Sequence, residues 1–174
     1  MPVRRKLIRN AVEQLLSAYD ISEPPVDVER LATNLGLEVR KQPAEDDLSG
    51  VLMRKTGTTA VVGVNRNHHR NRQRFTIAHE IAHFLLHPGD GLHVDKGYEV
   101  KRRDGKSSEG VDDEEKEANL FAAELLLPER FLVGDIAKLD GLDLSNDKVI
   151  AELAERYSVS AQAFGYRLAY LGFA

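Results

Sequence analysis

The sequence predicts an α+β fold with one main domain. Apolar residues recur at helical spacing near both ends of the chain, and three short runs rich in β-branched residues follow one another between residues 37 and 65. A long apolar helix comes directly after them. The chain has 174 residues, 42% of them hydrophobic, which suffices for a sizeable core. We expect residues 1–140 to form this domain and a helical segment, 141–174, to pack on it.

The first two elements are predicted to be helices. Apolar residues at helical spacing mark residues 5–18, and the sequence SEPP then closes the unit as a turn. The segment VDVERLATNLGL is expected to form the second helix, which Gly36 ends because glycine tolerates the left-handed conformation found after helix C-termini.

The middle of the chain is predicted to form a sheet and two long helices. The runs LEVRK, SGVLMRK and TAVVGVN indicate a three-stranded antiparallel meander packed on helices. A helix over 72–87 follows and ends at Pro88 and Gly89. Residues 88–112 are charged and glycine-rich without periodicity, so we expect a mobile loop, followed by a helix over 112–127 that Pro128 breaks.

The helix over 72–87 carries a pattern typical of a metal site. His79 and His83 are four residues apart and therefore share one helix face, while Glu80 lies about 100° round the axis. These groups would be costly to bury without partners. Two histidines, a third ligand and a nearby glutamate that deprotonates water are the parts of a zinc peptidase. We expect Zn²⁺, although Mn²⁺ or another divalent metal suits the same donors.

A third ligand is expected from the acid-rich helix over 112–127. The chain contains no cysteine, so the ligand must be a histidine or a carboxylate. Glu115 lies three residues before Ala118, on a small-residue face that permits close helix packing, whereas Glu117 points to another side. Geometry favours Glu115 and leaves Glu117 as the alternative.

Three further residues receive weaker interpretations. His87 ends the motif helix, where it is expected to cap free carbonyls rather than to bind metal. His93 and Tyr98 lie in the expected loop and are candidates for stabilising an oxyanion if that loop closes over substrate.

These motifs resemble those of a known family. The segments PPVDVERLATNLGLEV, LSGVL, VVGVN, RFTIAHEIAHFLLH and EKEANLFAAELLLP occur in the order seen in the ImmA/IrrE family of bacterial zinc metallopeptidases. The resemblance implies a zincin-like (gluzincin-like) minimal core, with His79, His83 and Glu115 as metal ligands and Glu80 as general base. It also implies an endopeptidase that cleaves a helix-turn-helix transcriptional repressor, encoded nearby, and so relieves repression in phage or mobile-element induction, stress or toxin–antitoxin-type regulation.

The C-terminal segment resembles a helix-turn-helix unit. The sequence VIAELAERYSVSAQAFGYRLAYLG has the apolar spacing of such a hairpin, but its second helix carries Arg167 as its one cation. DNA readers usually present several Lys or Arg side chains to phosphates. We therefore favour a hairpin that completes the core or grips the repressor, and keep as the alternative a non-cleaving metal-dependent regulator that binds a repressor or DNA.

Composition limits location and partners. A formal net charge of -4 argues against a general nucleic-acid coat. The chain shows neither a signal-peptide pattern nor the roughly 18 consecutive apolar residues that span a membrane. The sequence predicts a cytoplasmic protein without membrane contact and leaves its oligomeric state open.

Overall fold

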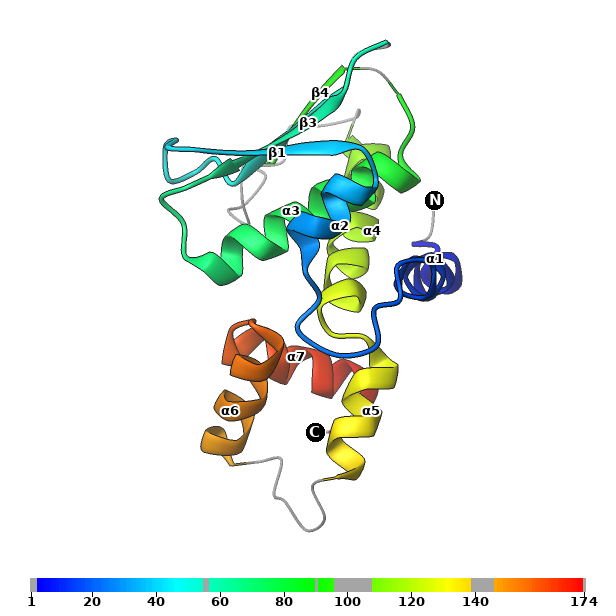
Figure 1. Cartoon of the computed structure of the whole chain (residues 1–174), viewed down its shortest axis with the longest axis vertical. Helices are drawn as coiled ribbons and strands as arrows, with labels where there is room; N and C mark the ends of the chain where they lie inside the picture. The colour runs from blue at the N-terminus through cyan, green and yellow to red at the C-terminus, as the bar shows by residue number, and fades with distance from the viewer. Residues whose placement is uncertain (1–2, 55–56, 90, 96–107, 139–145, 174) are drawn as a thin grey trace.

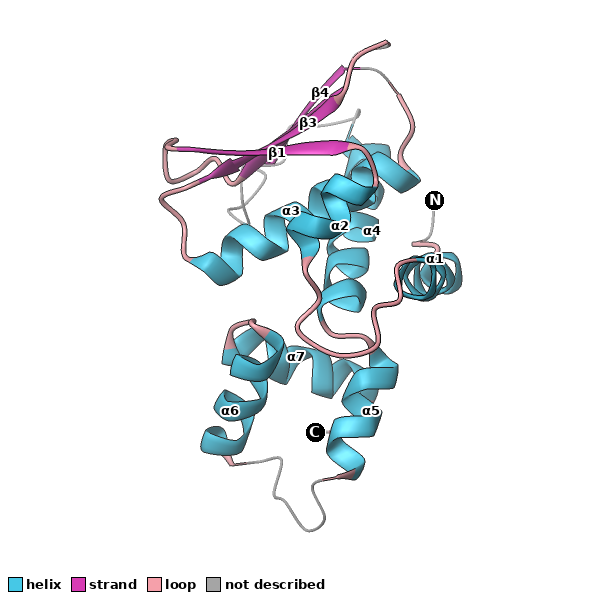
Figure 2. Ribbon diagram, viewed as in Figure 1, coloured by secondary structure: helices cyan, strands magenta, loops and turns pink. Residues whose placement is uncertain are grey.

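The computed structural model describes residues 3–54, 57–89, 91–95, 108–138 and 146–173. For residues 108–112 it describes the backbone alone. A four-stranded mixed sheet lies against helices, and further helices form the opposite end of the molecule (Figures 1 and 2). The α+β class is therefore confirmed. In chain order the elements are α1 (Arg5–Ala18), α2 (Val28–Asn34), β1 (Leu37–Gln42), β2 (Gly50–Arg54), β3 (Ala60–Asn65), α3 (Arg70–Leu86), β4 (Gly91–Asp95), α4 (Ser108–Leu126), α5 (Glu129–Ala137), α6 (Asp147–Tyr157) and α7 (Ala161–Leu171).

The sheet differs from the predicted antiparallel meander. Its order is β1-β3-β2-β4, with β1 parallel to β3 and β2 antiparallel to both β3 and β4. The β1–β2 connection crosses the end of β3, where the Asn65 side-chain amide donates to the carbonyl oxygens of Glu45 and Leu48, each at 2.9 Å. Because this connection is anchored there, β2 pairs on the far side of β3 rather than beside β1.

Strand β4 occupies part of the segment expected to be a mobile loop. It pairs with β2 from Gly91 opposite Arg54 to Asp95 opposite Gly50. Its apolar residues, Leu92 and Val94, are exposed on one side, so they give no sign of a buried face. Residues 96–107 of the expected loop, Tyr98 among them, lie outside the described residues.

The core lies between the sheet and two packed helices. α3 contacts β2, β3 and α4, and α1 packs on α4. Small residues at the α3–α4 contact, including Ala78, Ala82, Ala118 and Ala122, are fully buried, which allows the helices to approach closely. The predicted helices are present with shifted ends, since α3 begins at Arg70 and α4 at Ser108. Gly36 follows α2 with φ +81°, as predicted for a residue after a helix C-terminus.

The C-terminal helices α6 and α7 form the expected hairpin. Ser158 makes the turn in the left-handed conformation, and the rings of Tyr157 and Phe164 pack with centroids 5.6 Å apart. Arg167 of α7 is only 4% exposed, donates to the carbonyl oxygen of Leu127 at 3.1 Å, and pairs with Glu124 of α4. The hairpin is thus bound to α4 through its own cation. No described helix is both long and apolar enough to span a membrane.

Candidate metal centre

Two adjacent helices bring the predicted donors together. His79 and His83 lie on one face of α3, buried, with their Nε2 atoms 3.1 Å apart. Glu115 of α4 faces them: one carboxylate oxygen is 3.6 Å from His79 Nε2 and the other is 3.7 Å from His83 Nε2. The close α3–α4 packing predicted from small residues is what brings Glu115 within reach.

Glu117, the alternative third ligand, lies in a different set of contacts. Its carboxylate accepts hydrogen bonds from the Arg4 guanidinium, at 2.9 Å from Nε and 2.6 Å from Nη2, and from His87 Nε2 at 3.1 Å. The hydrogen bonds from Arg4 are the main reason that the pKa of Glu117 falls to about 2. Glu117 is therefore engaged elsewhere, and the geometry distinguishes the two glutamates.

His93 is a fourth candidate donor that the sequence analysis did not place among the ligands. It lies on β4, with Nε2 at 3.4 Å from a Glu115 oxygen and its ring 3.7 Å from that of His83, centroid to centroid. One ligand atom from each of His79, His83, His93 and Glu115 lies within 4.8 Å of all the others. The sequence showed no sign of His93 as a ligand because it showed no sign of β4, whose apolar residues do not form a buried face.

The electrostatics of this cluster fit a divalent cation. Burial lowers the pKa of His79, lowers that of His83 to about 2 and lowers that of His93 to about 4, so the imidazoles are neutral. His93 Nε2 is buried and has no hydrogen-bond partner among the described residues. Neutral imidazole nitrogens beside one carboxylate form a donor set that zinc and other divalent transition metals accept.

Contacts at Nδ1, the nitrogen facing away from the cluster, orient the two histidines of α3. His79 Nδ1 lies 3.0 Å from the side-chain oxygen of Asn119, an acceptor, so Nδ1 carries the proton and Nε2 offers its lone pair to the cluster. His83 Nδ1 lies 3.1 Å from His87 Nδ1. The sequence predicted that His87 would cap the helix, and it did not predict this contact with His83.

Glu80 lies beside the cluster without a partner. The side chain is fully buried, and neither carboxylate oxygen has a hydrogen-bond partner among the described residues. Burial, followed by the nearby Asp95 and Glu115 carboxylates, raises the pKa of Glu80 well above its usual value. A Cβ atom on Gly50 would lie 2.3 Å from the Thr76 side chain and 3.3 Å from Glu80 Oε1, so glycine preserves the space here.

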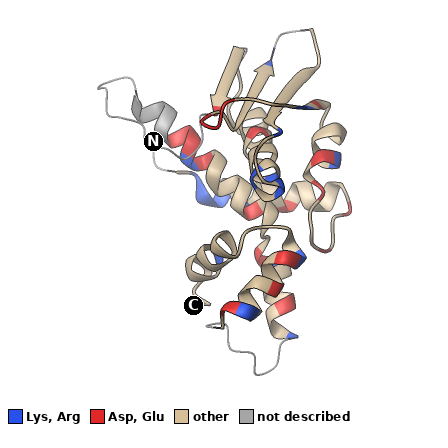
Figure 3. Cartoon of the chain, turned by 90° about the vertical axis from the view of Figure 1, so that its left-hand side faces the viewer, with Lys and Arg blue, Asp and Glu red and all other residues tan. Residues whose placement is uncertain are grey.

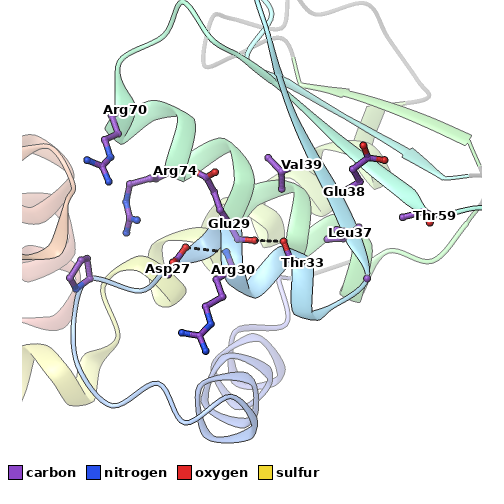
Figure 4. Close-up of a pocket in the computed structure, with 12 residues that line it drawn as sticks. Asp27, Glu29, Arg30, Thr33, Leu37, Glu38, Val39, Thr59, Arg70 and Arg74 are labelled. Carbon is purple, nitrogen blue, oxygen red and sulfur yellow. Dashed lines mark hydrogen bonds between the residues drawn. The ribbon is translucent and has the colours of Figure 1, made fainter.

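A hollow of about 1000 Å³ lies away from this cluster, between α2, β1 and the start of α3 (Figure 4). Its lining is polar and includes Asp27, Arg30, Glu38 and Arg70. Arg74 closes one side and donates to the Val26 carbonyl oxygen at 2.9 Å. The metal donors are not part of its lining, so the candidate centre is identified by its chemistry rather than by cavity size.

The described residues thus provide a candidate centre for a divalent metal between α3 and α4. A family model described as the IrrE N-terminal-like domain, Peptidase M78, matches residues 32–169, and this match places the chain in the metallopeptidase class. The chain belongs to this family, which confirms the resemblance found in the sequence.

Two relatives support the assignment, and one solved structure shares the fold. The chain is 30% identical over 158 residues to "Uncharacterized immunity region protein 2" of Bacillus phage phi105, covering 84% of this chain and 92% of the relative. It is 38% identical over 109 residues to "Radiation response metalloprotease IrrE" of Deinococcus deserti, covering 63% of this chain but only 36% of that protein. A Mycobacterium tuberculosis transcriptional regulator shares the fold, with a TM-score of 0.63 at 18% identity over 93% of this chain and 46% of its own.

Proposed function

We propose that the chain is a metal-dependent endopeptidase. The observation that carries this proposal is the convergence of His79, His83 and Glu115 on one point, beside a buried Glu80 whose oxygens have no hydrogen-bond partner among the described side chains. Membership of a peptidase family supports it, and so does similarity to a relative named as a metalloprotease. Zinc is the metal we propose, because imidazole and carboxylate donors suit it.

In this proposal the residues have separate roles. A divalent metal held by His79, His83 and Glu115 would polarise the scissile carbonyl and acidify a water molecule. Glu80, one position round the helix from the ligand face, accepts a proton from water and later delivers it to the leaving amine. A buried carboxylate suits this task when, as here among the described residues, no competing hydrogen bond occupies the oxygens that receive the proton.

We assign His93 to the substrate rather than to the permanent ligand set. A catalytic zinc site keeps one position open, and three protein ligands leave it open here. The proximity of His93 Nε2 to Glu115, at 3.4 Å, supports a role in which His93 donates a hydrogen bond to the developing oxyanion. This extends the interpretation of His93 made from the sequence.

The substrate we propose is a helix-turn-helix repressor encoded nearby, whose cleavage relieves repression in the cytoplasm. Support comes from the phage relative, whose name places it in an immunity region. The alternative is a non-cleaving regulator that binds a repressor or DNA. Direct DNA binding by α7 is disfavoured, because its one cation, Arg167, is buried against Glu124 and most of the helix surface carries no charge (Figure 3).

The test is incubation of the zinc-loaded chain with the neighbouring repressor, followed by intact-mass analysis. Glu80→Gln is the decisive variant because it keeps shape and removes the base, and the exposed Glu114→Gln is its matched control. We expect a single cut by the wild type and by Glu114→Gln, and none by Glu80→Gln, which should retain zinc. An uncut repressor recovered in a stable complex would favour the binding regulator instead.

A further inference from the structure

The contacts behind His83 continue away from the metal centre as a chain of four residues. His83 Nδ1 lies 3.1 Å from His87 Nδ1, His87 Nε2 lies 3.1 Å from Glu117 Oε2, and Glu117 pairs with Arg4 just before α1. His87 and Glu117 are buried, whereas the Arg4 side chain is 45% exposed. The chain therefore runs from the centre to the surface.

The donors of Arg4 fix the direction of the hydrogen bond between His87 and Glu117. Arg4 has only donors, and its backbone and guanidinium N–H groups occupy both oxygens of Glu117, so Glu117 acts as an acceptor. His87 Nε2 must then donate to Glu117. Whenever His83 Nε2 binds a metal, His83 Nδ1 carries the proton and donates to His87 Nδ1, 3.1 Å away. The contact with His87 therefore favours the form of His83 that presents an unprotonated Nε2 to the centre.

We propose that His87, Glu117 and Arg4 act as positioning residues that hold His83 in its metal-binding tautomer and orientation. This inference rests on the proposed metal site. His79 has a single supporting amide, Asn119, whereas His83 is supported by a buried histidine and a carboxylate that fixes that histidine. Through His87, the negatively charged Glu117 also makes His83 Nε2 a better electron-pair donor.

A pair of variants at position 87 separates positioning from packing. Leucine and asparagine have similar size, but the asparagine oxygen takes the place of Nδ1 and accepts from His83. We expect His87→Leu to raise the zinc Kd about 10- to 100-fold, and His87→Asn, which keeps an acceptor for His83 but loses the contact with Glu117, to raise it only several-fold. The Kd is measured by competition with a chromogenic chelator, and the circular dichroism of the metal-free proteins checks folding. Equal losses in both variants, or none in either, would overturn the proposal.

A pair of arginine variants tests the far end of the chain. Arg4 and Arg9 both pair with glutamates of α4 and are similarly exposed, but Arg9 pairs with Glu124, which lies away from His87. We expect Arg4→Ala to raise the zinc Kd several-fold and to shift the visible absorption bands of the Co²⁺-loaded protein, with no change for Arg9→Ala. Equal effects of the two substitutions would contradict the inference.

These measurements also distinguish this inference from the proposed function. A wild-type chain that binds no divalent metal would overturn both. A chain that binds zinc with the expected pattern of variants, yet leaves the repressor uncut, would support the positioning role and count against cleavage alone.

Discussion

Two regions of the molecule bury ionisable side chains, and they differ in how those side chains are partnered. Where α4 meets the C-terminal hairpin, Arg167 donates to Glu124 and to the Leu127 carbonyl oxygen. At the metal centre, Glu80 and His93 Nε2 lack hydrogen-bond partners among the residues described. Buried polar groups are normally satisfied, so the first region has the character of a structural joint. The polar atoms of the second region are available to a ligand from outside the polypeptide, which in our proposal is a metal ion with its water.

The largest effect should follow from removing a ligand. His83→Ala deletes one of the two imidazoles, and we expect zinc affinity to fall by more than about 100-fold, beyond the loss typical of supporting residues, together with all cleavage. Equilibrium dialysis and metal analysis measure the first, and intact-mass analysis of the repressor the second. If His83→Ala and Glu80→Gln lost metal equally, the division of roles between ligand and base would be wrong.

The joint should respond in stability rather than in metal binding. Arg167→Ala leaves Glu124 buried with only the distant Arg9, and breaking a buried pair costs about 3–5 kcal/mol of unfolding free energy. Urea unfolding measures this loss. Arg9→Ala is the matched control, because the Arg9 side chain is 47% exposed and lies 3.7 Å from Glu124, so its contribution should be at most about 1 kcal/mol. A large change in the zinc Kd of folded Arg167→Ala would remove the distinction between the two regions.

His93 lies at the centre but on a separate strand, and its substitution should have a smaller effect. If it contacts the oxyanion, His93→Ala lowers the cleavage rate about 100-fold or more while zinc affinity stays within about threefold. Steady-state cleavage and chelator competition give the two quantities. A matching fall in zinc affinity would instead make His93 a fourth ligand and the centre a closed one.

The smallest predicted effect concerns acid stability at the contact between α5 and α6. Burial by itself would raise the pKa of Asp135, but hydrogen bonds from Tyr157 at 2.9 Å, from Arg156 and from Lys138 outweigh it and lower that pKa. Its stabilisation is therefore complete above the unfolded pKa of about 3.9 and disappears as pH falls through the lower folded value.

Tyr157→Phe removes one of these donors and should cost about 1 kcal/mol at neutral pH and less in acid. Urea midpoints at pH 7 and pH 3 test this dependence. A loss of equal size at both pH values would show that the Tyr157 hydroxyl does not act through the charged form of Asp135.

Local spacing predicted the parts of the site that lie on one helix, and small-residue packing predicted its partner. His79, Glu80 and His83 follow from their places on a helical turn, and Glu115 follows from a shared face with Ala118. Because these relations span four residues or fewer, a sequence carries them directly.

The remaining contacts depend on long-range pairing and were not predictable. The sequence did not predict β4, because Leu92 is 63% exposed and Val94 is also exposed, so the strand lacks a buried apolar face. The β1–β3 parallel pairing depends on Asn65 anchoring a distant loop. His87 meets Glu117 only when α3 packs on α4, and Arg4 reaches Glu117 across a separation of 113 positions.

Helix α4 ties these regions together. It is 19 residues long, about 28 Å, and carries Glu115 towards the metal donors, Glu117 towards Arg4 and Glu124 towards the hairpin. A ligand that binds the folded site stabilises every part that unfolds together with it. Metal at 100 times its Kd adds about 2.7 kcal/mol to the free energy of unfolding of those parts. If the proposed centre binds metal, we expect loading to raise the melting temperature of the hairpin together with that of the core, and a chelator to lower both in a single transition.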